Sequence, residues 1–288
     1  MAQAQVNLSS THNMELNVLI IGDIVGRPGR MAVRELVPQL KEREKLHFCI
    51  ANAENAAGGS GITAKIADEL LSCGLNVLTS GDHIWKQKDV VEYIKNTTAL
   101  LRPANYPPEA VGNGYGVFPL KINPDIKIGV ANLQGRVFMQ PNADCPFHAI
   151  NNILPNIQNQ TKLIIVDLHA EATSEKVAMG WHLDGKVSCL FGSHTHIQTA
   201  DETILPKGTA YITDVGMCGP YESVIGRQTD RVLSAFITGM PFPFDVAKND
   251  IRVCGVIVTI DSKTGQALRI KRIQEKFTPP TDLSDGQE

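Results

Sequence analysis

The chain has 288 residues, of which 27 are Lys or Arg and 30 are Asp or Glu, and its formal net charge is −3. This mild acidity argues against a general nucleic-acid or membrane-surface binder, because such proteins present a basic field to an anionic partner. The length fits one large domain or two small ones. No apolar run approaches the roughly 20 residues that a membrane helix requires.

Six cysteines are spread along the chain without Cys-x-x-Cys spacing. This distribution indicates reduced thiols in a cytoplasmic protein rather than a disulfide framework or a zinc knuckle. The first 13 residues are polar and lack the apolar stretch of a signal peptide. We therefore expect residues 1–14 to be a flexible extension, although Met14, directly before the first predicted strand, is a candidate for the true start.

The first half of the chain predicts three strand–loop–helix units in succession. Apolar, β-branched runs that end in polar residues predict strands at 17–22, 48–55 and 76–83. Helices are expected at about 30–45, 63–73 and 86–95, with Thr63 as a cap of the second and Gly74 as its stop. Repeated units of this kind indicate an α/β layered fold with a mostly parallel sheet.

The second half is less regular. Residues 101–125 hold several Pro and Gly and predict irregular structure with a short strand at 116–120. Strands are further expected at 127–133, 161–169, 186–196 and 209–216, and helices at 148–158 and 173–182. The alternating runs 252–261 and 267–277 predict a hairpin. Since no long linker or repeat appears, we expect one domain over 15–278, followed by a polar tail at 279–288.

Polar side chains follow at least five of the predicted strands, at the point where each strand ends. They are Asp23, Glu54-Asn55, Asp82-His83, His169 and the pair His194 and His196. In open α/β sheets the carboxyl ends of parallel strands form the crevice that binds ligands. One such cluster is more often a turn, but five made of Asp, Glu, Asn and His predict a metal site. These ligand types suit iron, manganese or zinc.

The segment GSHTH, residues 192–196, is the strongest single signal. His194 and His196 are two residues apart, so in an extended segment they point the same way and can reach adjacent metals. The alternative is a pair of surface or capping histidines, which the preceding Leu190 and Phe191 disfavour. The other four histidines are expected to be ordinary surface or core residues: His12, His47, His148 and His182.

Seven segments carry a resemblance to a known family. They are GDIVGRPGR, ANAENAAGGSGIT, LTSGDHIW, LRPANYP, ANLQGRVFM, VDLHAEATSEK and GSHTHIQTAD. Over residues 17–277 the chain resembles the YmdB-like bacterial family of calcineurin-type metallophosphoesterases. The resemblance implies a layered calcineurin-like fold with central, mostly parallel or mixed β-sheets flanked by helices. It also implies that the substrate is a cyclic nucleotide or a related small phosphodiester. A 2′,3′-cyclic nucleotide would be hydrolysed to a 3′-nucleotide.

The same resemblance implies two divalent metal ions, iron or manganese first and zinc as an alternative. One ion would be held by Asp23, Glu54, Asn55 and His196, and the other by Glu54, Asp82, His169 and His194. The shared Glu54 would hold the ions about 3.5–4 Å apart, so that a hydroxide between them attacks phosphorus. His83 would protonate the leaving oxygen or stabilise charge on the phosphoryl group.

Position 82 departs from the family pattern, in which the residue is usually Asn. The added charge of Asp82 would tighten metal binding and repel phosphate. This keeps open a nucleotide-binding regulatory protein with a metal site and little turnover, as well as a broader phosphoesterase. A nuclease acting on polymeric RNA is disfavoured by the acidic balance.

Other residues are weaker candidates. Arg27, Arg136 and Arg227 each lie beside Gly and suit phosphate recognition, but an exposed salt bridge explains each equally well. Asp167 and Glu171 flank His169 and can orient its ring through a hydrogen bond, and Asp214, which ends another strand, is a further candidate for orienting a ligand. The glycines at 58–61 indicate a plain turn rather than a phosphate loop. The two predicted C-terminal strands can either form an interface between copies of the chain in a homo-oligomer or simply complete the sheet.

Overall fold

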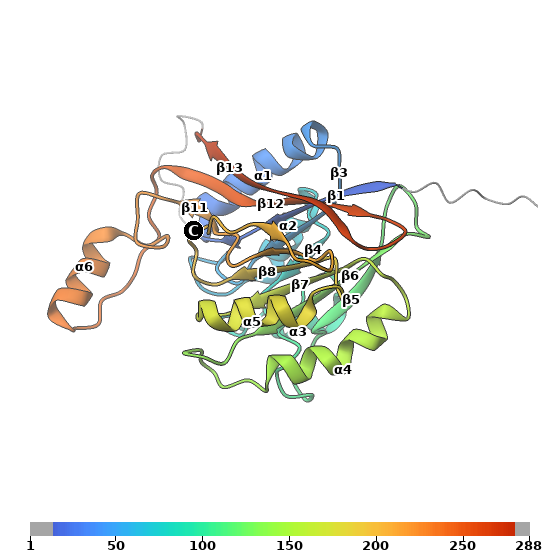
Figure 1. Cartoon of the computed structure of the whole chain (residues 1–288). Coiled ribbons are helices and arrows are strands. Elements are labelled where there is room, and N and C mark those ends of the chain that lie inside the picture. Colours follow the sequence, from blue (N-terminus) through green and yellow to red (C-terminus); the bar gives the residue numbers. More distant parts are fainter. Residues whose placement is uncertain (1–13, 280–288) are drawn as a thin grey trace, which may run out of the picture.

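The computed structural model describes residues 14–279. The predicted extension before Met14 and nearly all of the predicted tail lie outside this range. Two mixed β-sheets lie face to face, and helices cover their outer sides (Figure 1). Among the helices of the described range, none has both the length and the apolar character needed to cross a bilayer.

The first sheet has the strand order β2-β11-β12-β1-β3-β4, and β13 pairs with β12. Its strands are β1 (Glu15–Ile21), β2 (Asp23–Ile24), β3 (Leu46–Asn52), β4 (Val77–Thr79), β11 (Met217–Pro220), β12 (Ile251–Asp261) and β13 (Ala267–Phe277). β1, β3 and β4 are parallel, whereas β12 is antiparallel to β1. β12 and β13 also pair antiparallel, which confirms the predicted hairpin.

The second sheet has the order β5-β6-β7-β8-β10-β9. Its strands are β5 (Tyr115–Pro119), β6 (Lys127–Gln134), β7 (Ile164–His169), β8 (Cys189–Ser193), β9 (Thr203–Ile204) and β10 (Ala210–Ile212). The four central strands β6, β7, β8 and β10 are parallel, and the two edge strands run antiparallel to their neighbours. The carboxyl ends of the central strands therefore share one edge of the sheet.

The helices are α1 (Gly26–Arg43), α2 (Ala64–Ser72), α3 (Val90–Asn96), α4 (Pro146–Gln158), α5 (Thr173–Leu183) and α6 (Thr229–Thr238). The predicted cap is confirmed at α2, where the Thr63 hydroxyl accepts the Ile66 N–H at 3.2 Å. Gly74 follows this helix at a φ of +112°, a left-handed value that suits glycine. α6 was not predicted, and Figure 1 shows it standing away from the rest of the chain.

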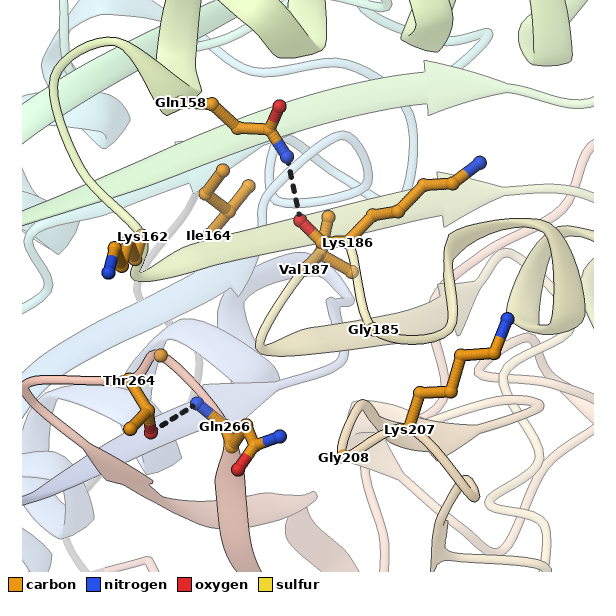
Figure 2. Close-up of a pocket in the computed structure, with 11 residues that line it drawn as sticks. Gln158, Lys162, Ile164, Gly185, Lys186, Val187, Lys207, Gly208, Thr264 and Gln266 are labelled. Atoms are coloured by element: carbon orange, nitrogen blue, oxygen red, sulfur yellow. Dashed lines mark hydrogen bonds between the residues drawn. The ribbon is translucent and has the colours of Figure 1, made fainter.

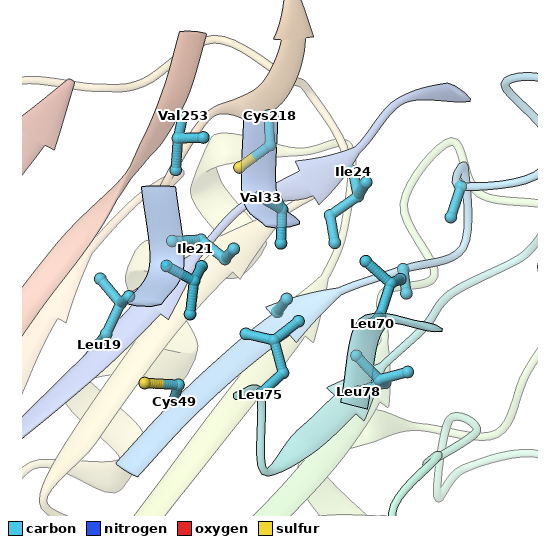
Figure 3. Packing of buried hydrophobic residues seen from close by; sticks show 14 of the residues in the cluster. Leu19, Ile21, Ile24, Val33, Cys49, Leu70, Leu75, Leu78, Cys218 and Val253 are labelled. Carbon is cyan, nitrogen blue, oxygen red and sulfur yellow. The ribbon is translucent and has the colours of Figure 1, made fainter. Parts of the chain in front are cut away.

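Alternation along β1 explains how the layers pack. Leu19 and Ile21 face the helices and share a cluster with Val33 of α1 (Figure 3). Val18 and Ile20 point the other way, into the cluster between the sheets that also contains Phe191 of β8. A strand buried on both faces reads as a continuous apolar run, as this one does. The predicted fold, layered α/β with mixed sheets flanked by helices, is confirmed.

Candidate metal centre

Five of the predicted site residues come from the first sheet. Asp23 opens β2 directly after β1, Glu54 and Asn55 form the turn after β3, and Asp82 and His83 follow β4. The Asp23 side chain is fully buried and that of Glu54 is 1% exposed. Since β1, β3 and β4 are parallel, their polar ends meet at one edge of the sheet.

The second sheet supplies the three histidines. His169 is the last residue of β7 and is fully buried, while His194 and His196 follow β8. A Cβ atom at Gly81 would lie 2.0 Å from Cδ2 of His169, so only glycine at this position lets the ring reach the first sheet. The structure thus brings together all eight residues singled out for metal binding and catalysis.

Four of these residues form a compact group. The Nε2 atom of His169 lies 3.1 Å from Oε1 of Glu54 and 3.3 Å from Oδ1 of Asp82. Nδ1 of His194 lies 3.0 Å from the same His169 nitrogen. One nitrogen or oxygen from each of the four residues lies within 4.8 Å of all the others. A metal ion fits this donor set, because two imidazoles and two carboxylates are common ligands of divalent transition metals.

A second group lies beside the first and shares Glu54 with it. Nε2 of His196 is 3.7 Å from Oδ1 of Asp23 and 3.2 Å from the amide nitrogen of Asn55. That amide nitrogen also lies 3.2 Å from Oε1 of Glu54. Oδ1 of Asp23 is buried and has no hydrogen-bond partner within the described residues. A buried acceptor without a donor is the environment that a cation would satisfy.

The electrostatics of the centre favour added positive charge. Burial raises the pKa of Asp23 to about 7, and the nearby Glu54 carboxylate adds to this rise. Burial disfavours a proton on His169, yet attraction to Glu54 and hydrogen bonding to Asp82 outweigh it and raise the His169 pKa well above its usual value. The same acids that hold this proton can hold a metal cation in its place.

His83 lies at the more accessible side of the centre, with 27% of its side chain exposed. Its Nδ1 atom is 2.8 Å from Oδ1 of Asn55, and its Nε2 atom is 3.4 Å from Oδ2 of Asp82. Both ring nitrogens therefore face oxygen atoms of residues in the centre.

Polar residues behind the histidines fix their orientation. Nδ1 of His169 lies 2.9 Å from the Ser193 hydroxyl, which donates to Asp167 at 2.7 Å. Asn52 donates to the other oxygen of Asp167 at 3.2 Å. Asp167 thus acts on His169 through Ser193, whereas Glu171 contacts His194 instead, at 3.2 Å. Sequence reasoning missed Ser193 and Asn52, although Ser193 directly precedes His194 and Asn52 lies two residues before Glu54.

The three arginines considered for phosphate recognition each lie in a different environment. Arg227 donates to the carbonyl of Gly59 at 3.1 Å, and its guanidinium lies over the ring of Phe244. Arg227 therefore links the chain just before α6 to the predicted glycine turn at residues 58–61. Arg136 is exposed, and its backbone N–H donates to the Glu175 carboxylate. Arg27 belongs to the first turn of α1.

A separate cavity of about 390 Å³ lies at the opposite ends of the second-sheet strands, next to Ile164 at the start of β7. Three lysines line it, Lys162, Lys186 and Lys207, and Figure 2 shows the first extending to the side opposite the other two. Because the amines do not converge, this cavity does not form a focused anion site. It is also distant in the fold from His169, at the far end of the same strand.

Comparison with known proteins connects this geometry to a family. The family model described as "YmdB-like protein" matches residues 19–273. A 2′,3′-cyclic-nucleotide 2′-phosphodiesterase of Bacillus subtilis is 45% identical over 258 residues, which cover 90% of this chain and 96% of the relative. A putative phosphatase/phosphodiesterase of Mycoplasma genitalium is 36% identical, with 90% of this chain and 92% of the relative covered.

Solved structures agree with the sequence relatives. A novel phosphatase from Mycoplasma pneumoniae superposes with a TM-score of 0.86 at 34% identity, covering 92% of this chain and 94% of that one. A hypothetical protein from Thermus thermophilus superposes with a TM-score of 0.84 at 36% identity, covering 91% of this chain and 99% of that one. Similarity therefore extends over nearly the whole described fold, including every strand end that supplies the candidate centre.

Proposed function

The chain belongs to the family of YmdB-like proteins, and from this membership we propose that it is a metal-dependent phosphodiesterase that hydrolyses 2′,3′-cyclic nucleotides to 3′-nucleotides. The substrate is that of the Bacillus subtilis relative. The observation that carries the proposal is the buried, unpartnered carboxylate oxygen of Asp23 beside a second acid–imidazole group, among the residues that the structure describes. Such a centre suits a cation and, through it, a phosphate ester.

We assign the ligands in two sets that share Glu54. The first set is Asp23, Glu54, Asn55 and His196, and the second is Glu54, Asp82, His169 and His194. The contacts of Glu54 with both His169 and Asn55 support a bridging position. Iron and manganese are the proposed ions, and zinc fits the same nitrogen and oxygen donors. When bound, they would supply Lewis acidity toward the phosphoryl oxygens and lower the pKa of the attacking water.

His83 is the proposed general acid. Water adds to phosphorus and the bond from phosphorus to O2′ breaks, so the departing O2′ needs a proton. The Nε2 atom of His83 would deliver that proton, because Nδ1 is engaged by the Asn55 side-chain oxygen. The phosphate then remains on O3′, and the product is a 3′-nucleotide.

Hydrolysis of 2′,3′-cyclic AMP by purified protein loaded with Mn²⁺ or Fe²⁺ tests this function. We expect 3′-AMP as the product, with kcat lowered by roughly 10²–10⁴ in His83→Ala, the range for loss of a general acid. Glu54→Gln should lose metal as well as activity. His148→Ala, an exposed histidine of α4, is the matched control and should behave as wild type. Formation of 2′-AMP, or equal rates in wild type and Glu54→Gln, would contradict the proposal.

Asp82 supports one alternative function, a nucleotide-binding regulator with a metal site and little turnover. A third carboxylate in the centre repels the phosphate group while it retains the metal. Under this alternative, wild type and Glu54→Gln are equally inactive and both bind the nucleotide. We further propose that the protein works as one domain over residues 15–278 in the cytoplasm. The apolar cluster shared by both sheets and the six unpaired cysteines support this view.

A further inference from the structure

A buried ion pair lies behind the histidine loop, which we define as residues 193–196. Lys176 of α5 is 1% exposed, and Asp214, which follows β10, is fully buried. The Nζ atom of Lys176 donates to Oδ2 of Asp214 at 2.8 Å. Removing two charges from water is costly, so we expect a buried ion pair of this kind to have a role other than packing.

Asp214 binds the centre of the histidine loop. Its Oδ2 atom accepts the Thr195 N–H at 3.1 Å and the Thr195 hydroxyl at 2.6 Å. Its Oδ1 atom accepts the Gly216 N–H at 2.8 Å, which orients the carboxylate from the other side. An ionised carboxylate has acceptor sites for all of these donors, and the Lys176 ammonium compensates its charge in the buried position.

Thr195 stands between two residues with unfavourable backbone conformations. His194 has a φ of +94° and His196 a φ of +65°, and both values are rare for residues other than glycine. Such conformations persist only where the surrounding contacts enforce them. The N–H of His194 is held by Asp23 at 3.2 Å and the side chain of His196 by the Ile225 carbonyl at 2.9 Å. Asp214 supplies the contact between them.

We propose that the Lys176–Asp214 pair is a positioning device that presets the two loop histidines for metal binding by fixing Thr195. Lys176 holds the Asp214 carboxylate in place, and Asp214 holds the loop in the conformation that directs His194 and His196 to the two ligand groups. The inference rests on the proposed metal-dependent function. Residues that orient metal ligands typically affect metal affinity by about 10–100-fold.

The experiment measures Mn²⁺ dissociation constants by calorimetry, together with kcat and KM, for wild type and five variants of the full chain. Lys176→Met and Asp214→Asn remove the pair, Thr195→Val removes only the hydroxyl contact, and Thr195→Ser restores it. Asp184→Asn is the matched control. Asp184 is also a buried acid that accepts a backbone N–H, that of Lys207, but it lies at the opposite end of the strands.

We expect the Mn²⁺ dissociation constant to rise by roughly tenfold or more in Lys176→Met, Asp214→Asn and Thr195→Val. Thr195→Ser and Asp184→Asn should stay close to wild type, and saturating Mn²⁺ should restore kcat in Thr195→Val with KM unchanged. A wild-type Mn²⁺ dissociation constant in Thr195→Val would overturn the proposal, even if the variants that remove the pair fail to fold. A wild type that binds no Mn²⁺ would overturn it too, whereas Mn²⁺ binding without hydrolysis would contradict only the proposed function.

Discussion

At the scale of single residues, the charge at position 82 controls the balance between metal and substrate. Burial would raise the pKa of Asp82, but its hydrogen bond to His169 and the nearby histidines lower it to about 2. The carboxylate is therefore charged at neutral pH, as a third acid beside Asp23 and Glu54. Its charge adds to metal attraction and opposes binding of an anionic substrate.

Asp82→Asn should accordingly shift two measured constants in opposite senses. We expect the Mn²⁺ dissociation constant to rise by roughly tenfold, while the KM for 2′,3′-cyclic AMP falls because one repulsive charge is lost. Calorimetry and steady-state rates at saturating Mn²⁺ separate the two effects. Asp125→Asn makes the same charge change in the loop before β6, away from the centre, and should alter neither constant. An increase in KM for Asp82→Asn would show that Asp82 assists the substrate rather than repelling it.

At the scale of secondary-structure elements, the predictable parts are those whose side chains point to a core. β1 was predicted because both of its faces are buried, and the strand-end residues were found because each follows such a run. α6 was missed because its apolar residues Phe236 and Ile237 face solvent, so their pattern carries no link to a core. Asp214 was found because it ends a strand, but its pairing with Lys176 was missed, since a lysine within a helical pattern is normally exposed and the two residues lie 38 positions apart.

The weak anchoring of α6 leads to a prediction about its dynamics. This ten-residue helix buries only Val232, whereas α1 buries six residues, and helices this short are marginal without tertiary contacts. Backbone amides of α6 should therefore exchange with deuterium at least roughly tenfold faster than those of α1, because local opening requires little loss of packing. Mass spectrometry of peptic fragments measures both helices in one sample. Equal protection would mean that a surface outside the single chain, such as a second copy, covers Phe236 and Ile237.

At the scale of the whole molecule, the centre joins the two sheets, so metal binding should stabilise the entire fold. Asp23, Glu54 and Asp82 come from one sheet and His169 from the other. Each acid is brought near the others only by folding, and a cation that bridges the sheets binds the folded state alone. Stability then increases with metal concentration according to mass action.

Addition of Mn²⁺ at a hundredfold excess over its dissociation constant contributes about 2.7 kcal/mol to the free energy of unfolding. For a domain near this size, that corresponds to a rise in Tm of roughly 5–10 °C. Calorimetric melting of EDTA-treated protein, with and without Mn²⁺, measures the difference, and a second EDTA treatment should reverse it. Glu54→Gln, which lacks the carboxylate shared by both ligand groups, should show a much smaller rise at the same Mn²⁺ concentration. If wild type binds Mn²⁺ yet melts at the same temperature with and without it, the unfolded chain binds the ion equally well, so the site is not built by folding and the ligand assignment is wrong.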